Sequence, residues 1–250
     1  MRLCRFKVGG KERFGIYSEG EIRGIKGNLF SPGKETGKTY REDEVEFLPP
    51  TQPTKIACIG FNFMKHRDEL KDIATDEPTI TLLAANSVTG HNRDILLPEI
   101  SKKVDHEAEL GVVIGKRGYR IEKPKEHILG YTIVNDVTAR DIEHEMVQWS
   151  PSKSFPGFCP VGPCINTELD ARNLRIQCRV NDEVRQDSRT GGMIYSPEEC
   201  VRFVSKFMIL ERGDLIATGT VPGIGRLEDG DVVEVEIDGI GVLRNFMKKE

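Results

Sequence analysis

The sequence predicts a β-rich α+β fold. Short segments in which apolar and polar residues alternate recur along the chain, for example at residues 2–8, 174–180 and 232–237, and this two-residue period is typical of strands with one buried face. Helical patterns are few, and the clearest covers residues 196–207, where Ser196-Pro197 followed by two acidic residues forms a typical helix start. Many short strands with few helices favour an α+β arrangement over a doubly wound parallel sheet.

The chain divides into a small first part and a large second part. Residues 1–50 are predicted to form a small N-terminal β-meander, because two alternating segments flank the turn signal Gly9-Gly10. Three prolines between residues 49 and 53 then indicate a stiff connector. We therefore expect the second, larger domain to cover residues 55–250.

Composition excludes several classes of protein. The chain carries 36 basic and 40 acidic residues, with a net charge of −4 and both signs scattered along it, which does not suggest nucleic-acid binding. No apolar run approaches the length of a membrane span. The six cysteines contain no Cys-x-x-Cys pair and are expected to be reduced core residues. We expect a cytoplasmic protein with neither nucleic acid nor membrane as a partner.

Two acids lie in the most apolar part of the sequence. Glu107 and Glu109 fall within residues 104–115, a segment that is otherwise strongly apolar and is predicted to be a strand, so both side chains should share one face. Buried carboxylates repel each other and need a positive partner between them. Asp136 follows the next apolar segment, residues 130–134. Three carboxylates suit Mg²⁺ or Mn²⁺, and the lack of a matching histidine and cysteine set disfavours zinc.

The His66–Glu69 pair and Lys153 each allow two interpretations. His66 and Glu69 would share one face of a short helix that begins near residue 62, and on its own this segment favours a surface pair. Residues 137–148 are predicted to be helical, whereas residues 152–163 contain too much proline and glycine for regular structure. Lys153 in that loop is either a surface lysine or a cation directed at an anionic substrate.

Four blocks of sequence match the pattern of a known family. They are Val104-Asp105-His106-Glu107-Ala108-Glu109-Leu110, Gly130-Tyr131-Thr132-Ile133-Val134-Asn135-Asp136 with Val137-Thr138-Ala139-Arg140-Asp141, Lys153-Ser154-Phe155-Pro156-Gly157-Phe158-Cys159-Pro160-Val161-Gly162-Pro163, and Thr218-Gly219-Thr220-Val221-Pro222-Gly223-Ile224-Gly225. Together they resemble the fumarylacetoacetate hydrolase family. Its fumarylacetoacetate hydrolase domain-containing proteins are the most similar, judging by Gln148-Trp149-Ser150 and Asn181-Asp182-Glu183-Val184-Arg185-Gln186-Asp187-Ser188. The resemblance extends from about Lys55 to the C-terminus. The resemblance implies a mixed β-sandwich roll, a homodimer and a Mg²⁺ or Mn²⁺ site.

The resemblance also implies roles for individual residues. The metal-binding acids fall on Glu107, Glu109 and Asp136. A histidine and glutamate dyad that activates water falls on His66 and Glu69, which changes the surface reading of that pair. Anion-binding groups fall on Arg140, Lys153 and Thr220, and Lys153 is also expected to be catalytic.

The implied activity is cleavage of a C–C bond in a 2-oxo acid or 1,3-dicarbonyl compound of the acylpyruvate type, through a metal-chelated enolate. The same chemistry would serve a decarboxylase of a 2-oxo diacid such as oxaloacetate, or an isomerase or hydratase of an unsaturated 2-oxo acid. A non-catalytic family member is the remaining alternative. Ala84-Ala85-Asn86 and Glu143 depart from the family pattern, one by loss of a lysine and the other by gain of an acid. Both departures disfavour a doubly anionic substrate.

Overall fold

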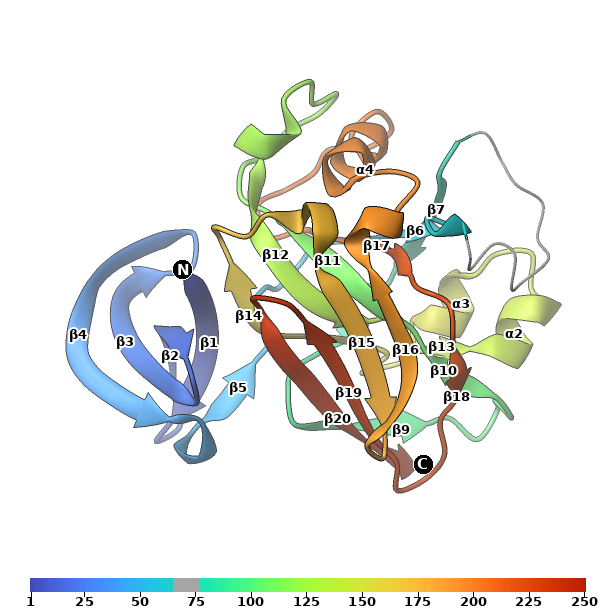
Figure 1. Cartoon of the computed structure of the whole chain (residues 1–250), viewed down its shortest axis with the longest axis horizontal. Helices are drawn as coiled ribbons and strands as arrows, with labels where there is room; N and C mark the ends of the chain where they lie inside the picture. Colours follow the sequence, from blue (N-terminus) through green and yellow to red (C-terminus); the bar gives the residue numbers. More distant parts are fainter. Residues whose placement is uncertain (65–76) are drawn as a thin grey trace.

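The computed structural model describes residues 1–64 and 77–250. Two large β-sheets pack face to face, and the short helices lie around their margins (Figure 1). Leu110 and Ile133 from one sheet, with Ile176 and Val235 from the other, belong to the same buried core. A core between two sheets explains the two-residue period of strands such as Val232–Ile237, in which every second residue is buried.

The larger sheet contains twelve strands in the described part of the chain. Along its main path the order is β4 (Ser31–Arg41), β3 (Glu21–Asn28), β2 (Lys11–Ser18), β1 (Arg2–Val8), β14 (Cys159–Asn166), β12 (Ile128–Asn135), β11 (Ala108–Ile114), β17 (Leu215–Thr220), β6 (Ile56–Gly60) and β7 (Thr79–Leu83), and β5 (Glu46–Leu48) and β8 (Val88–Thr89) pair with β1 and β14. The β6–β17 pair is parallel and most other pairs are antiparallel, so the sheet is mixed.

The second large sheet has five strands, a third sheet has three, and the described residues also contain three α-helices. The five-stranded sheet has the order β16 (Glu183–Arg189), β15 (Arg175–Val180), β19 (Val232–Ile237), β20 (Gly241–Lys249) and β9 (Arg93–Leu97), and the three-stranded sheet has the order β13 (Thr138–Ala139), β10 (Val104–His106) and β18 (Gly225–Arg226). The α-helices in the described residues are α2 (Arg140–Glu145), α3 (Ser150–Lys153) and α4 (Pro197–Val204).

The N-terminal strands form the predicted meander. Strands β1 to β4 pair in sequence order, and β1 also pairs with β14, so the meander extends the larger sheet to one side (Figure 1). The expected fold, a β-rich mixed β-sandwich roll with a small N-terminal meander, is confirmed.

Two predictions of local structure are wrong. Residues 104–115 are not one strand, because the chain leaves the three-stranded sheet after β10 and enters the larger sheet at β11, with Glu107 at the break. The proline-rich segment is not irregular throughout, since its second half forms β14 in the middle of the larger sheet. Pro163 falls where the register between β12 and β14 shifts, so its missing N–H removes no regular bond of the ladder.

The predicted helix over residues 137–148 is shorter than expected. Its first residues instead form β13, and α2 ends at Glu145. The helix predicted over 196–207 is α4, and Ser196 caps it in a reciprocal capping box with Glu199. The capping residues thus predicted where α4 begins, whereas both ends of α2 and the end of α4 differ from the prediction.

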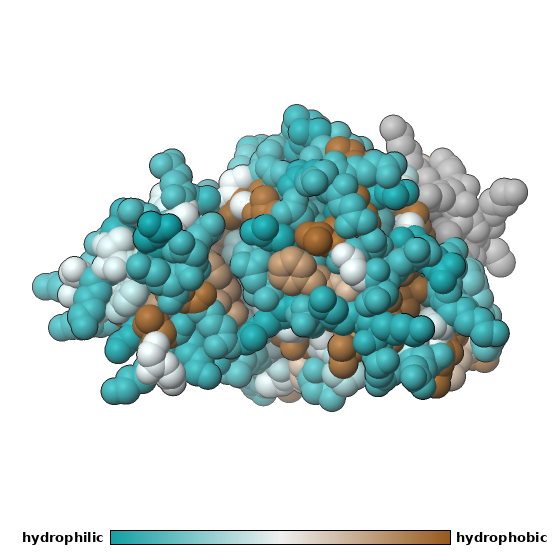
Figure 2. Space-filling model, turned by 90° about the horizontal axis from the view of Figure 1, so that it is seen from below, coloured by the Kyte–Doolittle hydropathy of each residue, from teal (hydrophilic) through white to brown (hydrophobic). Residues whose placement is uncertain are grey.

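The surface and the cysteines fit the composition. Figure 2 shows a face on which hydrophobic residues form small groups among hydrophilic ones, as is usual for globular proteins. All six cysteines are free and buried, as predicted. In the part of the chain that the structure describes, no helix has both the length and the apolar character needed to span a membrane.

Candidate active site

The break between β10 and β11 brings two acids together. The backbone N–H of Glu107 donates to Asn135 Oδ1 at 3.0 Å, and its carbonyl accepts from the N–H of Asp136 at 2.9 Å. Asn135 is the last residue of β12, which is paired with β11. These two bonds hold Glu107 beside Asp136 although 28 residues separate Glu107 from Asn135 in the sequence.

Glu109 is held by a glycine of the neighbouring strand. The Gly219 N–H donates to Glu109 Oε2 at 2.7 Å. Gly219 has a φ of +97°, and a Cβ atom there would lie 2.7 Å from the Cβ of Asn62. Only glycine meets both conditions without strain, which explains why glycine stands between Thr218 and Thr220.

The three acids form a cluster that suits a divalent cation. Glu107, Glu109 and Asp136 are buried, and each offers one carboxylate oxygen within 4.8 Å of the others. Asp136 Oδ1 is buried without a hydrogen-bond partner among residues 1–64 and 77–250, which is costly unless a ligand supplies the partner. Donors that are all oxygen are those preferred by Mg²⁺ and Mn²⁺, so the residues present fit such an ion.

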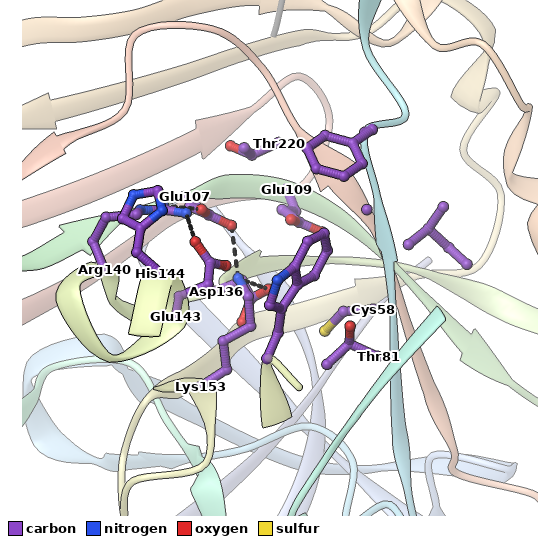
Figure 3. A pocket seen from close by; sticks show the side chains of 14 residues that line it. Cys58, Thr81, Glu107, Glu109, Asp136, Arg140, Glu143, His144, Lys153 and Thr220 are labelled. Carbon is purple, nitrogen blue, oxygen red and sulfur yellow. Dashed lines mark hydrogen bonds and ion pairs between the residues drawn. The ribbon is translucent and has the colours of Figure 1, made fainter. Parts of the chain in front are cut away.

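Two buried cations lie against the same acids (Figure 3). Lys153 Nζ, at the end of α3, donates to Glu107 Oε2 at 2.9 Å, Asp136 Oδ2 at 2.8 Å and Thr138 Oγ1 at 2.7 Å. These three bonds use all the hydrogens of the ammonium group.

The second cation, Arg140, begins α2 and pairs with three carboxylates. Its Nε donates to Asp105 Oδ2 at 2.9 Å, and its two terminal nitrogens pair with Glu107 and Glu143. Both oxygens of Glu107 therefore accept from a cation.

Burial and charge shift the pKa values of this cluster. Loss of solvent raises the pKa of Glu109 well above its usual range, and the nearby charges of Asp136 and Glu107 raise it further. Burial also raises the pKa of Asp136, against the opposing effect of Lys153. For Lys153 burial favours the neutral form, but Asp136 and Glu107 outweigh it and raise the pKa of the ammonium. The same balance, with Glu107 and Glu143 as partners, raises the pKa of Arg140.

The cluster opens into a cavity of about 110 Å³. Trp149 and Phe61, in edge-to-face contact with ring centroids 5.2 Å apart, form part of its apolar wall. Thr81, His144 and Thr220 also line the cavity. This volume is small beside the roughly 300–1,000 Å³ of pockets for larger ligands. The site therefore favours a small molecule with oxygen atoms for the cation and an apolar part for the rings.

Six of the eight predicted site residues meet in this cavity. They are Glu107, Glu109, Asp136, Arg140, Lys153 and Thr220. His66 and Glu69 lie outside the described residues, so their roles stay predictions.

Sequence reasoning did not assign Asp105, Thr138, Trp149 or the aromatic partner Phe61 to the site. Asp105 could have been found, since it stands two residues before Glu107 in the same strand-like segment. Thr138, which accepts from Lys153, could also have been found because it stands two residues after Asp136, whereas Trp149 and Phe61 reach the cavity only through the packing of distant segments.

Comparisons with known protein families show to which family the chain belongs. The model described as "Fumarylacetoacetate (FAA) hydrolase C-terminal" matches residues 55–248, and the model described as "Rv2993c-like, N-terminal" matches residues 1–50. The chain belongs to the fumarylacetoacetate hydrolase family. The resemblance inferred from the four sequence blocks is thereby confirmed.

Relatives within the fumarylacetoacetate hydrolase family have different activities. The chain is 42% identical over 217 residues to the mitochondrial oxaloacetate tautomerase FAHD2A of Bos taurus, covering 81% of this chain and 69% of the relative. It also matches the structure of a 2-hydroxyhepta-2,4-diene-1,7-dioate isomerase from Mycobacterium marinum with 35% identity and a TM-score of 0.92, covering 100% and 99% of the two chains.

A third relative contains a metal ion. The structure of maleylpyruvate hydrolase from Sphingobium sp. SYK-6, in complex with manganese(II) and pyruvate, matches with 25% identity and a TM-score of 0.83 over 100% of this chain and 99% of the other. Family members thus include a tautomerase, an isomerase and a hydrolase, and one of them binds Mn²⁺.

Proposed function

We propose that this protein is a divalent-metal-dependent enzyme that moves a proton next to the keto group of a small 2-oxo acid. The buried carboxylate cluster, open to a small cavity and flanked by two cations, is the observation that carries this proposal. Enolisation is the step that tautomerisation, isomerisation and C–C cleavage of such compounds share.

Glu107, Glu109 and Asp136 would hold the cation, with Mg²⁺ and Mn²⁺ as the candidates. A bound divalent ion would withdraw electron density from the oxygen atoms of the oxo acid and so acidify the neighbouring C–H bond. Oxygen-only donors and the orphaned Asp136 Oδ1 support this assignment.

Lys153 and Arg140 would set the positions of the acids. Because all three hydrogens of Lys153 are bound, contact with a substrate oxygen requires the exchange of one of its present bonds. Arg140, paired with Asp105, Glu107 and Glu143, would orient Glu107 more than it would bind a free anion. Its pairing with Glu143 supports the expectation that a doubly anionic substrate is disfavoured.

We rank tautomerisation or isomerisation first, because relatives with these activities are 42% and 35% identical to this chain. C–C bond hydrolysis, the expectation from sequence, is the second candidate, supported by the maleylpyruvate hydrolase structure. Hydrolysis also needs an activated water, a role proposed for His66 with Glu69.

A panel of substrates tests the proposal. Purified protein with Mg²⁺ or Mn²⁺ is incubated with oxaloacetate, acylpyruvates and unsaturated 2-oxo acids, while enol absorbance is followed and products are identified. Tautomers or isomers conserve mass, hydrolysis gives two acids, and decarboxylation gives CO₂. Glu109→Ala serves as the matched inactive variant. No metal-dependent turnover of any compound would contradict the proposal and favour a non-catalytic family member.

His66→Ala tests the predicted dyad. We expect Mn²⁺ affinity to remain and turnover to be lost, by about 100-fold or more for removal of a general base. Calorimetry and the same substrate assay measure the two quantities. Unchanged turnover would remove His66 from the mechanism.

The predicted homodimer is a separate proposal, which light scattering of the purified protein tests.

A further inference from the structure

The peptide group that joins Thr218 to Gly219 lies where β17 departs from its regular pairing with β11. The register between the two strands shifts at this point, and such a β-bulge turns a backbone group out of the ladder. The N–H of this peptide group donates to Glu109 Oε2 at 2.7 Å. Since Glu109 lines the cavity (Figure 3), the bulge directs a backbone donor at one of the three clustered acids.

The carbonyl of the same peptide group is held by Asn62. This buried residue follows β6, the strand that runs parallel to β17. Its Nδ2 donates to the Thr218 carbonyl at 2.7 Å and to the Tyr195 carbonyl at 2.9 Å. Its Oδ1 accepts from the Tyr195 N–H at 2.7 Å. A flipped amide would set an acceptor against both carbonyls and a donor against the N–H, so the backbone fixes how Asn62 is oriented.

Glycine alone does not fix the orientation of the peptide group. Gly219 has a φ of +97°, and turning the peptide over would bring this φ to a negative value that glycine adopts as readily. The turned peptide would direct the Thr218 carbonyl, in place of an N–H, at the Glu109 carboxylate. Asn62 opposes this change, because its buried amide would lose an acceptor.

We infer that Asn62 is a positioning residue that holds the 218–219 peptide group, so that its N–H keeps Glu109 in place as a metal ligand. This inference rests on the proposed function and deepens it, since it adds a residue that acts on the metal site through the backbone of another strand. With Oε2 held, the Glu109 carboxylate has less conformational freedom to lose when a cation binds. Groups that hold metal ligands in this way typically change metal affinity by about 10–100-fold.

Asn62→Ala tests the inference through Mn²⁺ affinity. We expect calorimetry on the full chain to show roughly tenfold weaker binding or more, because the peptide group is no longer held. Asn245→Ala is the matched control. Asn245 is also a buried asparagine whose Nδ2 donates to two backbone carbonyls, those of Gly90 and Arg93, but it lies on β20 of the five-stranded sheet. Asn245→Ala should leave Mn²⁺ affinity within about twofold of the wild type.

A double variant shows whether the effect passes through Glu109. In the Glu109→Ala background the carboxylate that the peptide group holds is absent, so Asn62→Ala should weaken Mn²⁺ binding by less than about twofold further. If Asn62→Ala does not fold, Asn62→Ser replaces it, because the serine hydroxyl is one atom shorter than the amide and does not reach the Thr218 carbonyl.

Amide hydrogen exchange of the metal-free chain gives a readout that involves no metal. The Gly219 N–H should exchange about tenfold faster in Asn62→Ala than in Asn245→Ala, because only the first variant releases the peptide group. Equal exchange of the Gly219 N–H in the two variants would mean that Asn62 does not hold this peptide group.

The outcomes separate this inference from the proposed function. The inference is overturned by wild-type Mn²⁺ affinity in Asn62→Ala, by an equal loss in Asn245→Ala, or by a loss that persists in full without Glu109. The expected changes in affinity without turnover of any 2-oxo acid overturn only the proposed function. Failure of the wild-type protein to bind Mn²⁺ overturns both.

Discussion

Ion pairs at the outer edge of the larger sheet and ion pairs beside its central strands differ in their exposure to water. At the outer edge, on β3 and β4, Arg23 pairs with Glu35 at 3.2 Å, and each side chain is 50% exposed. At the centre, Lys153 pairs with Glu107 and Asp136, and none of these side chains is more than 7% exposed. Water screens the outer pair, whereas the central charges depend on one another. The exposure of an ion pair, more than the types of residue in it, therefore sets how far its removal lowers the free energy of unfolding.

The largest expected effect on stability comes from Lys153→Met. Among the described residues, removal of the Lys153 ammonium takes away the cation that Asp136 and Glu107 share, so buried Asp136 loses its ion pair and Glu107 keeps only that with Arg140. We expect the free energy of unfolding of the metal-free protein to fall by roughly 3–5 kcal/mol. Urea unfolding in EDTA measures it, with Lys38→Met on the exposed strand β4 as the control. Equal stability of the two variants would contradict the contrast between centre and edge.

Metal affinity should change most in Glu109→Ala. Loss of one of three acidic ligands is expected to lower Mn²⁺ affinity by about 100-fold or more, while the metal-free fold persists because the variant removes a mutually repelling acid. Calorimetry with Mn²⁺ and circular dichroism check the two parts. Glu35→Ala on β4 should bind Mn²⁺ as the wild type does. Full affinity in Glu109→Ala would exclude Glu109 as a ligand.

A smaller effect is expected from pH. The pKa values of Glu109 and Asp136 are raised in the folded chain, first by burial, so the folded state binds protons more readily than the unfolded state. Stability of the metal-free protein should therefore rise as pH falls from 8 to 6.5. Below the ordinary histidine pKa of 6.5, His91, whose pKa burial lowers to about 4, acts in the opposite sense.

Thermal unfolding in EDTA across this pH range measures the slope, and Glu109→Gln should flatten it. Excess Mn²⁺ should reverse the slope, because the ligands must then lose their protons. A slope that is the same in the wild type and in Glu109→Gln would show that this carboxylate does not titrate in the range.

The smallest effect is expected at the edge of the sheet. Glu35→Gln removes the half-exposed pair with Arg23 and should change the free energy of unfolding by less than about 1 kcal/mol. Urea unfolding at low and high salt checks this value. A loss as large as that in Lys153→Met would mean that exposure does not govern the energy of these pairs.

The sequence by itself determined the fold class, the buried acids and the family. Alternating segments report directly on faces of strands, and Glu107, Glu109 and Asp136 stand out because acids are rare in apolar segments. The strand faces and the acids are local signals, since each depends on residues a few positions apart, whereas the family follows from the order of four blocks along the chain.

Only the tertiary structure decided how the acids are used. Three features depend on strands that are far apart in the sequence but adjacent in the fold. They are the change of sheet at Glu107, the pairing of Lys153 with an acid 46 residues away, and the bond from Gln186 to Thr220 across 34 residues. In its own segment Lys153 was one lysine of a proline-rich loop, and only the family resemblance implied that it belongs to the site. Its partners were not predictable from that segment, because the hydrogen bonds of a buried cation are set by the strands packed around it and not by its neighbours in the chain.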